Sequence, residues 1–153
     1  MVLKMKMPTK PLEILLIEDN KGDIGLVTEF FSNEKVIINI HIAEDGEEAL
    51  RFLYDKDKFL GSKLPDLIIL DLNLPKKDGR EVLKEIKENI DLKAIPVIIL
   101  TTSSAEKDIC RVYDLQANAY IVKPIYFDEF MAAIKSITDF WFKTVTLPPK
   151  HSH

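Results

Sequence analysis

Carboxylate, hydroxyl and ammonium groups recur in this sequence at one kind of position, directly after a short apolar run. The residues at these positions are Glu18, Asp19, Asp71, Thr101 and Lys123. If the apolar runs are strands of one parallel sheet, their carboxyl ends share an edge and the polar groups meet there. Each residue alone has an ordinary explanation, as a helix cap, a turn residue or a solvated charge. Those explanations do not account for the convergence of the whole set.

Three carboxylates at one edge repel one another. At a separation of ~4 Å and an effective dielectric constant of ~20, each pair costs about 4 kcal/mol, so a bound cation is expected. Oxygen ligands of this kind favour Mg²⁺, which commonly bridges to a phosphoryl group. A carboxylate can accept a phosphoryl group as a mixed anhydride, and Lys123 and Thr101 would then stabilise its charge. We therefore expect magnesium-dependent phosphoryl transfer.

The cysteine and histidine residues form no cluster that would indicate zinc. Cys110 is the single cysteine, which fits a reducing cytoplasm. His41 falls in a predicted strand, where a structural role is the simpler interpretation. His151 and His153 fall in the C-terminal tail.

Apolar, β-branched runs alternate with segments of helical period along the chain. The predicted strands are Leu12–Ile17, Val36–Ile42, Leu67–Leu70, Pro96–Leu100 and Ala119–Val122. The predicted helices are Lys21–Ser32, Glu47–Tyr54, Arg80–Asn89, Ala105–Leu115 and Tyr126–Phe142. This alternation predicts a doubly wound α/β fold, in which a five-stranded parallel sheet carries helices on both faces.

Three of the predicted helices begin with a capping signal, an Asp or Ser followed three positions later by Glu. These pairs are Asp45 with Glu48, Asp78 with Glu81, and Ser103 with Glu106. The first residue can accept a hydrogen bond from a free N–H of the first turn, and the acid is favoured by the helix dipole.

The size and charge of the chain favour one globular domain. It has 153 residues, of which 46% are apolar and 30% charged, and its formal net charge is −4. We expect a domain over 11–143, a flexible tail over 1–10 and a second tail over 144–153. No apolar run approaches the ~20 residues that span a bilayer, and the negative charge argues against DNA as a partner. We expect a cytoplasmic protein without a membrane segment.

Four motifs together make the sequence resemble the receiver domains of two-component response regulators. They are Leu16-Ile17-Glu18-Asp19-Asn20, Leu70-Asp71-Leu72-Asn73-Leu74-Pro75 with Asp78-Gly79, Leu100-Thr101-Thr102-Ser103, and Tyr120-Ile121-Val122-Lys123-Pro124. The resemblance covers about Leu12 to Phe142 and implies a flavodoxin-like strand order, 2-1-3-4-5.

Within that family, the sequence is most similar to single-domain regulators that partner phytochrome-type histidine kinases. The features that carry this similarity are the run from Asn73 to Leu83, the long loop around Lys58 to Pro65, and the aromatic end of the last helix. The partner implied is a sensor histidine kinase.

The resemblance implies a role for each motif residue. Asp71 would accept the phosphoryl group, and Lys123 would bind it. Glu18, Asp19, Asp71 and the backbone carbonyl of Asn73 would hold Mg²⁺, directly or through water. Thr101 and Tyr120 would be the switch pair: on phosphorylation Thr101 moves toward the phosphoryl group and Tyr120 turns inward. The Lys123–Pro124 peptide bond would be cis.

Two positions depart from the common family pattern. Thr102 stands where receivers often have Ala, Gly or Ser, and the residue at this position borders the phosphoryl group. The rate of dephosphorylation is therefore left open. Glu18 stands where Asp is more frequent, which leaves metal binding unaffected.

The last predicted helix carries an apolar stripe at helical spacing, which predicts a face packed on the sheet. The stripe is Phe127, Phe130, Met131, Ile134, Ile137 and Trp141. Phe140 and Phe142 lie off it and are expected to be exposed, which suggests a homodimer through this helix. Because the sequence contains no DNA-binding or catalytic output domain, we expect the output to be a protein contact or onward phosphoryl transfer.

Three other functions fit the sequence less well. A pseudo-receiver would be an interaction module that is never phosphorylated, and the complete set of site residues argues against it. A phosphatase with an aspartyl intermediate usually has its nucleophile after the first strand and a second Asp two residues later, where this chain has Asn73. A flavin-binding carrier needs a phosphate-binding loop after the first strand, where Glu18 and Asp19 would repel the phosphate.

Overall fold

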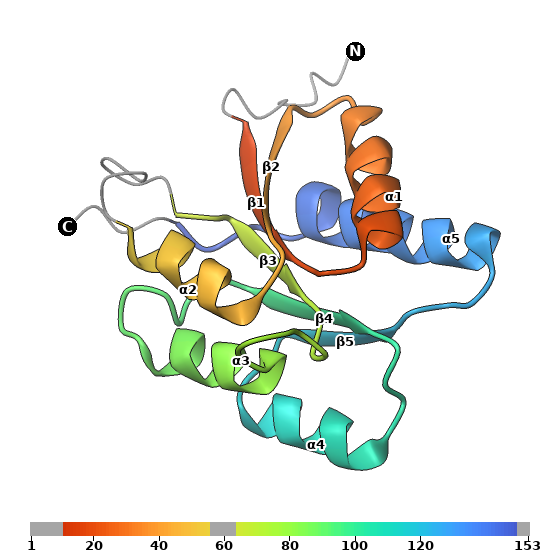
Figure 1. The fold of residues 1–153 in the computed structure, drawn as a ribbon. Coiled ribbons are helices and arrows are strands. Elements are labelled where there is room, and N and C mark those ends of the chain that lie inside the picture. Colours follow the sequence, from red (N-terminus) through yellow and green to blue (C-terminus); the bar gives the residue numbers. More distant parts are fainter. Residues whose placement is uncertain (1–10, 56–63, 150–153) are drawn as a thin grey trace.

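The computed structural model describes residues 11–55 and 64–149 and contains one parallel sheet with helices on both sides (Figure 1). The strands are β1 (Leu12–Ile17), β2 (Ile38–Ala43), β3 (Leu67–Leu70), β4 (Val97–Thr101) and β5 (Ala119–Val122). The helices are α1 (Lys21–Ser32), α2 (Gly46–Tyr54), α3 (Gly79–Glu88), α4 (Glu106–Asp114) and α5 (Phe127–Thr138), followed by a π-helix over Asp139–Thr144. The strand order is β2-β1-β3-β4-β5, which confirms the predicted fold class.

The sheet separates two apolar layers. Helices α2, α3 and α4 cover one face, and α1 and α5 cover the other (Figure 1). Successive residues of the central strands alternate between the layers: Ile68 packs with the first group of helices and Ile69 with the second. Because both faces are covered, every residue of β3 and β4 is buried. This is why these segments are continuously apolar in sequence.

The predicted helix starts are partly confirmed. Asp45 accepts a hydrogen bond from the backbone N–H of Glu48 at 2.7 Å, as expected, while the Glu48 carboxylate accepts from the N–H of Glu44 at 3.2 Å. Asp78 also caps its helix, but it accepts from the N–H of Arg80 at 3.0 Å rather than from the third residue.

The predicted cap at Ser103 is wrong. Helix α4 begins at Glu106 after Ala105, which provides no side-chain cap. The Ser103 hydroxyl donates to Asp108 in the first turn of α4 at 2.7 Å, and its oxygen accepts only a long hydrogen bond, 3.4 Å, from the Ala105 N–H before the helix. The side chain that the sequence pattern assigned to the cap is therefore held mainly by an acid of the same helix.

The end of the last helix also differs from the prediction. The α-helix stops at Thr138, and the six residues that follow form a π-helix. Because π-helical turns are wider, successive side chains rotate by less than in an α-helix. Phe142, expected to be exposed, is partly buried with its ring 6.0 Å from that of Phe31. Phe140 is 51% exposed, as expected, whereas Phe127, expected in the core, is exposed at the first position of α5.

Three predicted segments fall largely or wholly outside the described residues: the N-terminal tail, the long loop before β3, and the last four residues. The part of the C-terminal tail that the structure describes extends from the π-helix to Pro149. Within the described ranges, no helix has the combination of length and apolar character needed to cross a membrane.

Candidate functional site

The side chains predicted to converge do meet at the carboxyl edge of the sheet. Glu18 follows β1, Asp71 follows β3, Thr101 ends β4 and Lys123 follows β5. All four are buried, although their groups are polar or charged. Buried charges are normally paired, so their contacts determine what the site can do.

Lys123 is the ion-pair centre of the site. Its ammonium nitrogen lies 3.0 Å from Asp71 Oδ2 and 2.8 Å from Asp23 Oδ2, and it also pairs with Glu18. These carboxylates raise the pKa of Lys123 despite the opposing effect of burial. Sequence reasoning missed Asp23, because an acid in the first turn of a helix is ordinarily explained by the helix dipole.

The two carboxylate oxygens of Asp71 have different partners. Oδ1 accepts hydrogen bonds from the Thr101 hydroxyl at 2.8 Å and from the Asn73 backbone N–H at 3.1 Å, while Oδ2 accepts from Lys123. Burial alone would favour the neutral acid. The hydrogen bonds, first from Glu18 and then from Thr101, together with the charge of Lys123, hold the pKa of Asp71 below its ordinary value. Asp71 is therefore ionised at neutral pH, the form that a nucleophilic carboxylate requires.

Glu18 has the opposite protonation behaviour. Burial raises its pKa from an ordinary 4.5 to about 7, and the neighbouring charge of Asp71 contributes in the same direction. Its Oε2 atom accepts from the backbone N–H groups of Asp19 and Asn20, at 3.1 and 3.3 Å. Asn20, not either acid, caps α1 by accepting from the N–H of Asp23 at 2.9 Å. Glu18 and Asp19 are therefore not used to cap α1 and remain available to the site.

A glycine brings α3 close to the acceptor. The Gly79 N–H donates to the Leu72 carbonyl at 2.9 Å, and a β-carbon at position 79 would lie 2.3 Å from the carbonyl oxygen of Asp71. A side chain at this position would therefore displace the segment after β3. Gly79 therefore allows α3 to begin directly beside Asp71 and Leu72.

Three acids are arranged so that they can share a cation. Glu18, Asp19 and Asp71 each offer a carboxylate oxygen, and these atoms lie within 4.8 Å of one another. Glu18 and Asp71 are buried, and Asp19 is exposed at the mouth of the site. An all-oxygen set with one open side fits a hard cation that keeps part of its water shell, such as Mg²⁺. A role for the Asn73 carbonyl stays a prediction.

Tyr120, the other member of the predicted switch pair, lies in β5 and pairs with Ile99 of β4. Its ring packs against the core layer of α2, α3 and α4, and its hydroxyl donates to the Ser103 carbonyl at 2.8 Å. Thr101 meanwhile donates to Asp71 at 2.8 Å. This is the inward arrangement that the family resemblance associates with the phosphorylated form.

The expected cis Lys123–Pro124 bond is wrong, because the described residues contain no cis peptide bond. Lys123 reaches the acids through the usual trans form, which is intrinsically the more stable one for bonds preceding proline.

Thr102 is exposed beside the buried Thr101. His41 pairs with Glu13 at 2.7 Å, and Cys110 is exposed on α4.

The strand order and the polar groups at the carboxyl edge of the sheet define the class of protein, and sequence comparison identifies its family. The family of response regulator receiver domains matches residues 14–135. This chain belongs to that family.

The particular relatives are regulators of the narrower kind that the sequence suggested. Response regulator Rcp1 of Synechocystis sp. is 46% identical over 138 residues, covering 90% of this chain and 94% of the relative. The crystal structure of the Mn²⁺-bound form of Rcp1 has a TM-score of 0.85 at 46% identity and covers 91% of this chain and 100% of that one. The phosphorylated cyanobacterial phytochrome response regulator RcpA has a TM-score of 0.87 at 46% identity, covering 92% and 100%.

The raised pKa of Glu18 leads to a pH-dependent metal affinity. Below about pH 7 the carboxyl keeps a proton, which Mg²⁺ must displace to bind. Affinity should therefore rise by up to about tenfold per pH unit below that pKa and level off above it. Calorimetric titration with Mg²⁺, one unit below and one unit above the pKa, measures both the affinity and the proton released.

Glu18→Gln is the matched control, because it preserves the shape of the side chain and removes its titration. Its binding should be weaker, with little dependence on pH. Equal Mg²⁺ affinities for the unmodified protein at the two pH values would show that Glu18 does not hold the proton.

Proposed function

We propose that this protein is a single-domain response regulator that accepts a phosphoryl group onto Asp71 from a histidine kinase, with Mg²⁺. The observation that carries the proposal is the coordination of one buried carboxylate, with Thr101 and the Asn73 N–H on one oxygen and Lys123 on the other. The receiver unit would comprise residues 11–143. We propose a cytoplasmic signalling switch that catalyses only its own phosphorylation and dephosphorylation.

Each residue of the site has a separate role in the proposed phosphoryl transfer. A carboxylate oxygen of Asp71 forms a bond to phosphorus as the bond from phosphorus to the kinase histidine breaks. Lys123 and Thr101 already contact this carboxylate, so both are placed to stabilise negative charge on the transferred group. Bound at Glu18, Asp19 and Asp71, Mg²⁺ would neutralise further charge there. The acyl phosphate formed is later hydrolysed by water.

The relatives support the finer parts of the proposal. RcpA is a phytochrome response regulator crystallised in its phosphorylated form, and Rcp1 was crystallised with Mn²⁺. A phytochrome-type histidine kinase is therefore the proposed partner. Output would pass through protein contacts or onward transfer.

The competing interaction-module function gains no support from the geometry. An unused site would not need to keep Asp71 ionised, Glu18 buried and Lys123 paired with both, because buried charges are costly without a function or a partner. A test of phosphorylation therefore distinguishes a response regulator from an interaction module.

Incubation with acetyl phosphate and Mg²⁺ should add the mass of one phosphoryl group to the intact protein. EDTA and Asp71→Asn should each abolish the adduct, because the first removes the metal and the second the nucleophile. Asp114→Asn is the control, since Asp114 is an exposed acid at the end of α4. Intact mass spectrometry measures the result. No adduct, together with no binding of beryllofluoride, would favour the unphosphorylated module.

We also propose a homodimer through α5 and the segment before it. Ile125 is 94% exposed, Tyr126 and Phe127 are exposed beside it, and Phe140 is exposed in the π-helix that follows α5. Exposed apolar groups on neighbouring segments are typical of a contact surface.

Phe140→Glu should shift the dimer toward monomer in sedimentation velocity, because the charge would be buried at the contact. Ile90→Glu is the control, since Ile90 is an exposed apolar residue outside α5. An unmodified protein that sediments as a monomer both with and without beryllofluoride would exclude the dimer.

A further inference from the structure

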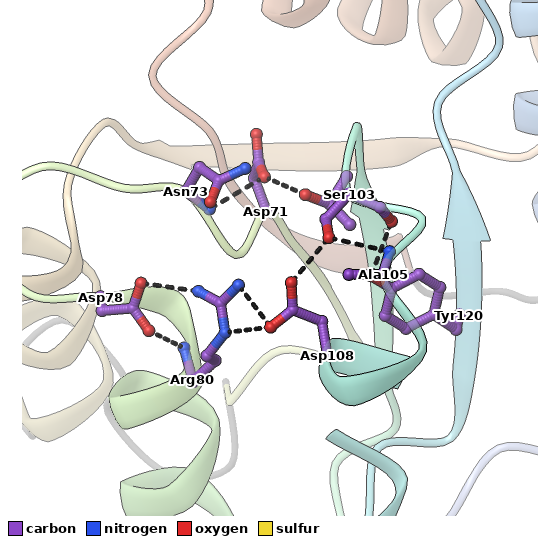
Figure 2. A network of polar contacts seen from close by, with 9 residues as sticks. Asp71, Asn73, Asp78, Arg80, Ser103, Ala105, Asp108 and Tyr120 are labelled. Atoms are coloured by element: carbon purple, nitrogen blue, oxygen red, sulfur yellow. Dashed lines mark hydrogen bonds and ion pairs between the residues drawn. The ribbon is translucent and has the colours of Figure 1, made fainter. Parts of the chain in front are cut away.

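A second polar network joins α3 to α4 below the phosphoryl-accepting site (Figure 2). Arg80 of α3 donates from Nε to Asp108 Oδ1 at 3.0 Å, and its Nη2 lies 2.8 Å from the same oxygen. Its Nη1 donates to Asp78 Oδ1 at 2.9 Å. Asp78 caps α3 and Asp108 lies in the first turn of α4. One guanidinium therefore connects the starts of both helices.

Ser103 connects this network to the segment between β4 and α4. Its hydroxyl donates to the second oxygen of Asp108 at 2.7 Å, and its carbonyl accepts from the Tyr120 hydroxyl at 2.8 Å. The Ser103 residue is thus held by α4 through its side chain and by β5 through its backbone. We call Arg80, Asp108 and Ser103 the clasp.

The clasp is sheltered enough for its charges to matter. The side chain of Arg80 is 22% exposed and that of Asp108 is 14% exposed. The Ser103 hydroxyl, followed by Arg80, lowers the pKa of Asp108, so the carboxylate is charged at neutral pH. Charge-assisted hydrogen bonds in such partly buried positions are stronger than surface ion pairs.

The clasp contacts the chain close to the acceptor. Ser103 lies two residues after Thr101, whose hydroxyl donates to Asp71. Tyr120 lies in β5, where it pairs with Ile99 of the neighbouring strand β4 and packs against the core. A movement of Ser103 would therefore release the Tyr120 hydroxyl and loosen the end of β4 together.

We propose that Arg80 and Asp108 are positioning residues that hold Ser103 so that Tyr120 stays inward and Thr101 stays beside Asp71, which ties the position of α4 to phosphoryl binding. The proposal rests on the proposed function for the identity of the bound group. A clasp that merely pinned α3 to α4 would add stability without moving Tyr120. The position of the Tyr120 ring therefore distinguishes a positioning role from a purely stabilising contact.

The test compares Asp108→Ala with Glu106→Ala. Both variants remove one acid from the first turn of α4, and Glu106 is exposed. The first measurement is the ¹⁹F NMR resonance of 3-fluorotyrosine at position 120, assigned with Tyr120→Phe. The second is the affinity for beryllofluoride with Mg²⁺, as a stable mimic of the phosphoryl group. Asp108→Asn serves as a milder second variant.

Asp108→Ala should move the Tyr120 resonance toward its position in unfolded protein and weaken beryllofluoride binding by about fivefold or more, the lower range of site-to-site coupling. Asp108→Asn should act in the same direction, and Glu106→Ala should change neither. In a Tyr120→Phe background the effect of Asp108→Ala on affinity should be smaller, because the hydroxyl contact with Ser103 is already absent and only the path through the end of β4 remains.

An unchanged Tyr120 resonance in Asp108→Ala, or fully additive effects of the two substitutions on affinity, would overturn the clasp. If the unmodified protein does not bind beryllofluoride, the proposed function fails instead. In that case the Tyr120 resonance still tests whether Arg80 and Asp108 position Ser103, because this measurement requires no phosphoryl chemistry.

Discussion

The arrangement of the site depends on one ammonium group among carboxylates. Lys123 contacts Asp71, Asp23 and Glu18, and its side chain and those of Glu18 and Asp71 are less than a tenth exposed. Like charges at such distances repel by about 4 kcal/mol per pair at an effective dielectric constant of ~20. The acids can remain close together because Lys123, and a proton on Glu18, offset that repulsion. A divalent cation can replace the proton.

This constraint explains why the site requires the whole sheet. Lys123 is supplied from the end of β5, while the acids come from the ends of β1 and β3 and from α1. Because the central strands are buried on both faces, their ends are fixed relative to one another. Thr101, from β4, connects the acceptor to the segment that leads to α4. If the proposed clasp is correct, a change of charge at Asp71 would reach α4 through Thr101, Ser103 and Tyr120.

Much of this could be predicted from sequence. Continuous apolar runs identified the bounds of β1, β3 and β5, and the residues after them identified Glu18, Asp71 and Lys123. The expected cis Lys123–Pro124 bond came from the family resemblance, and the other errors arose where a contact outside the local rule held the side chain. Ser103 has the sequence of a helix cap, but Asp108 binds its hydroxyl. Phe142 falls off the helical stripe, but a π-helix turns it toward Phe31.

The residues that sequence reasoning did not find are those whose partners are distant along the chain. Asp23 and Lys123 are 100 positions apart, and Arg80 and Asp108 are 28 positions apart. Acids in first turns and an arginine on an exposed helix have simple local explanations. No single-sequence pattern distinguishes them from members of a network. Only the sheet topology brings them together.

The most direct test of the central claim is the free energy of unfolding of the unmodified protein and of Lys123→Met as Mg²⁺ is varied. We predict that the variant is less stable by about 3 kcal/mol without Mg²⁺, the usual cost of removing one partner of a buried ion pair. Mg²⁺ should stabilise the variant more than the unmodified protein, because the metal then supplies the missing positive charge. A loss that is the same at every Mg²⁺ concentration, or no loss at all, would contradict the claim that Lys123 offsets the repulsion among the acids.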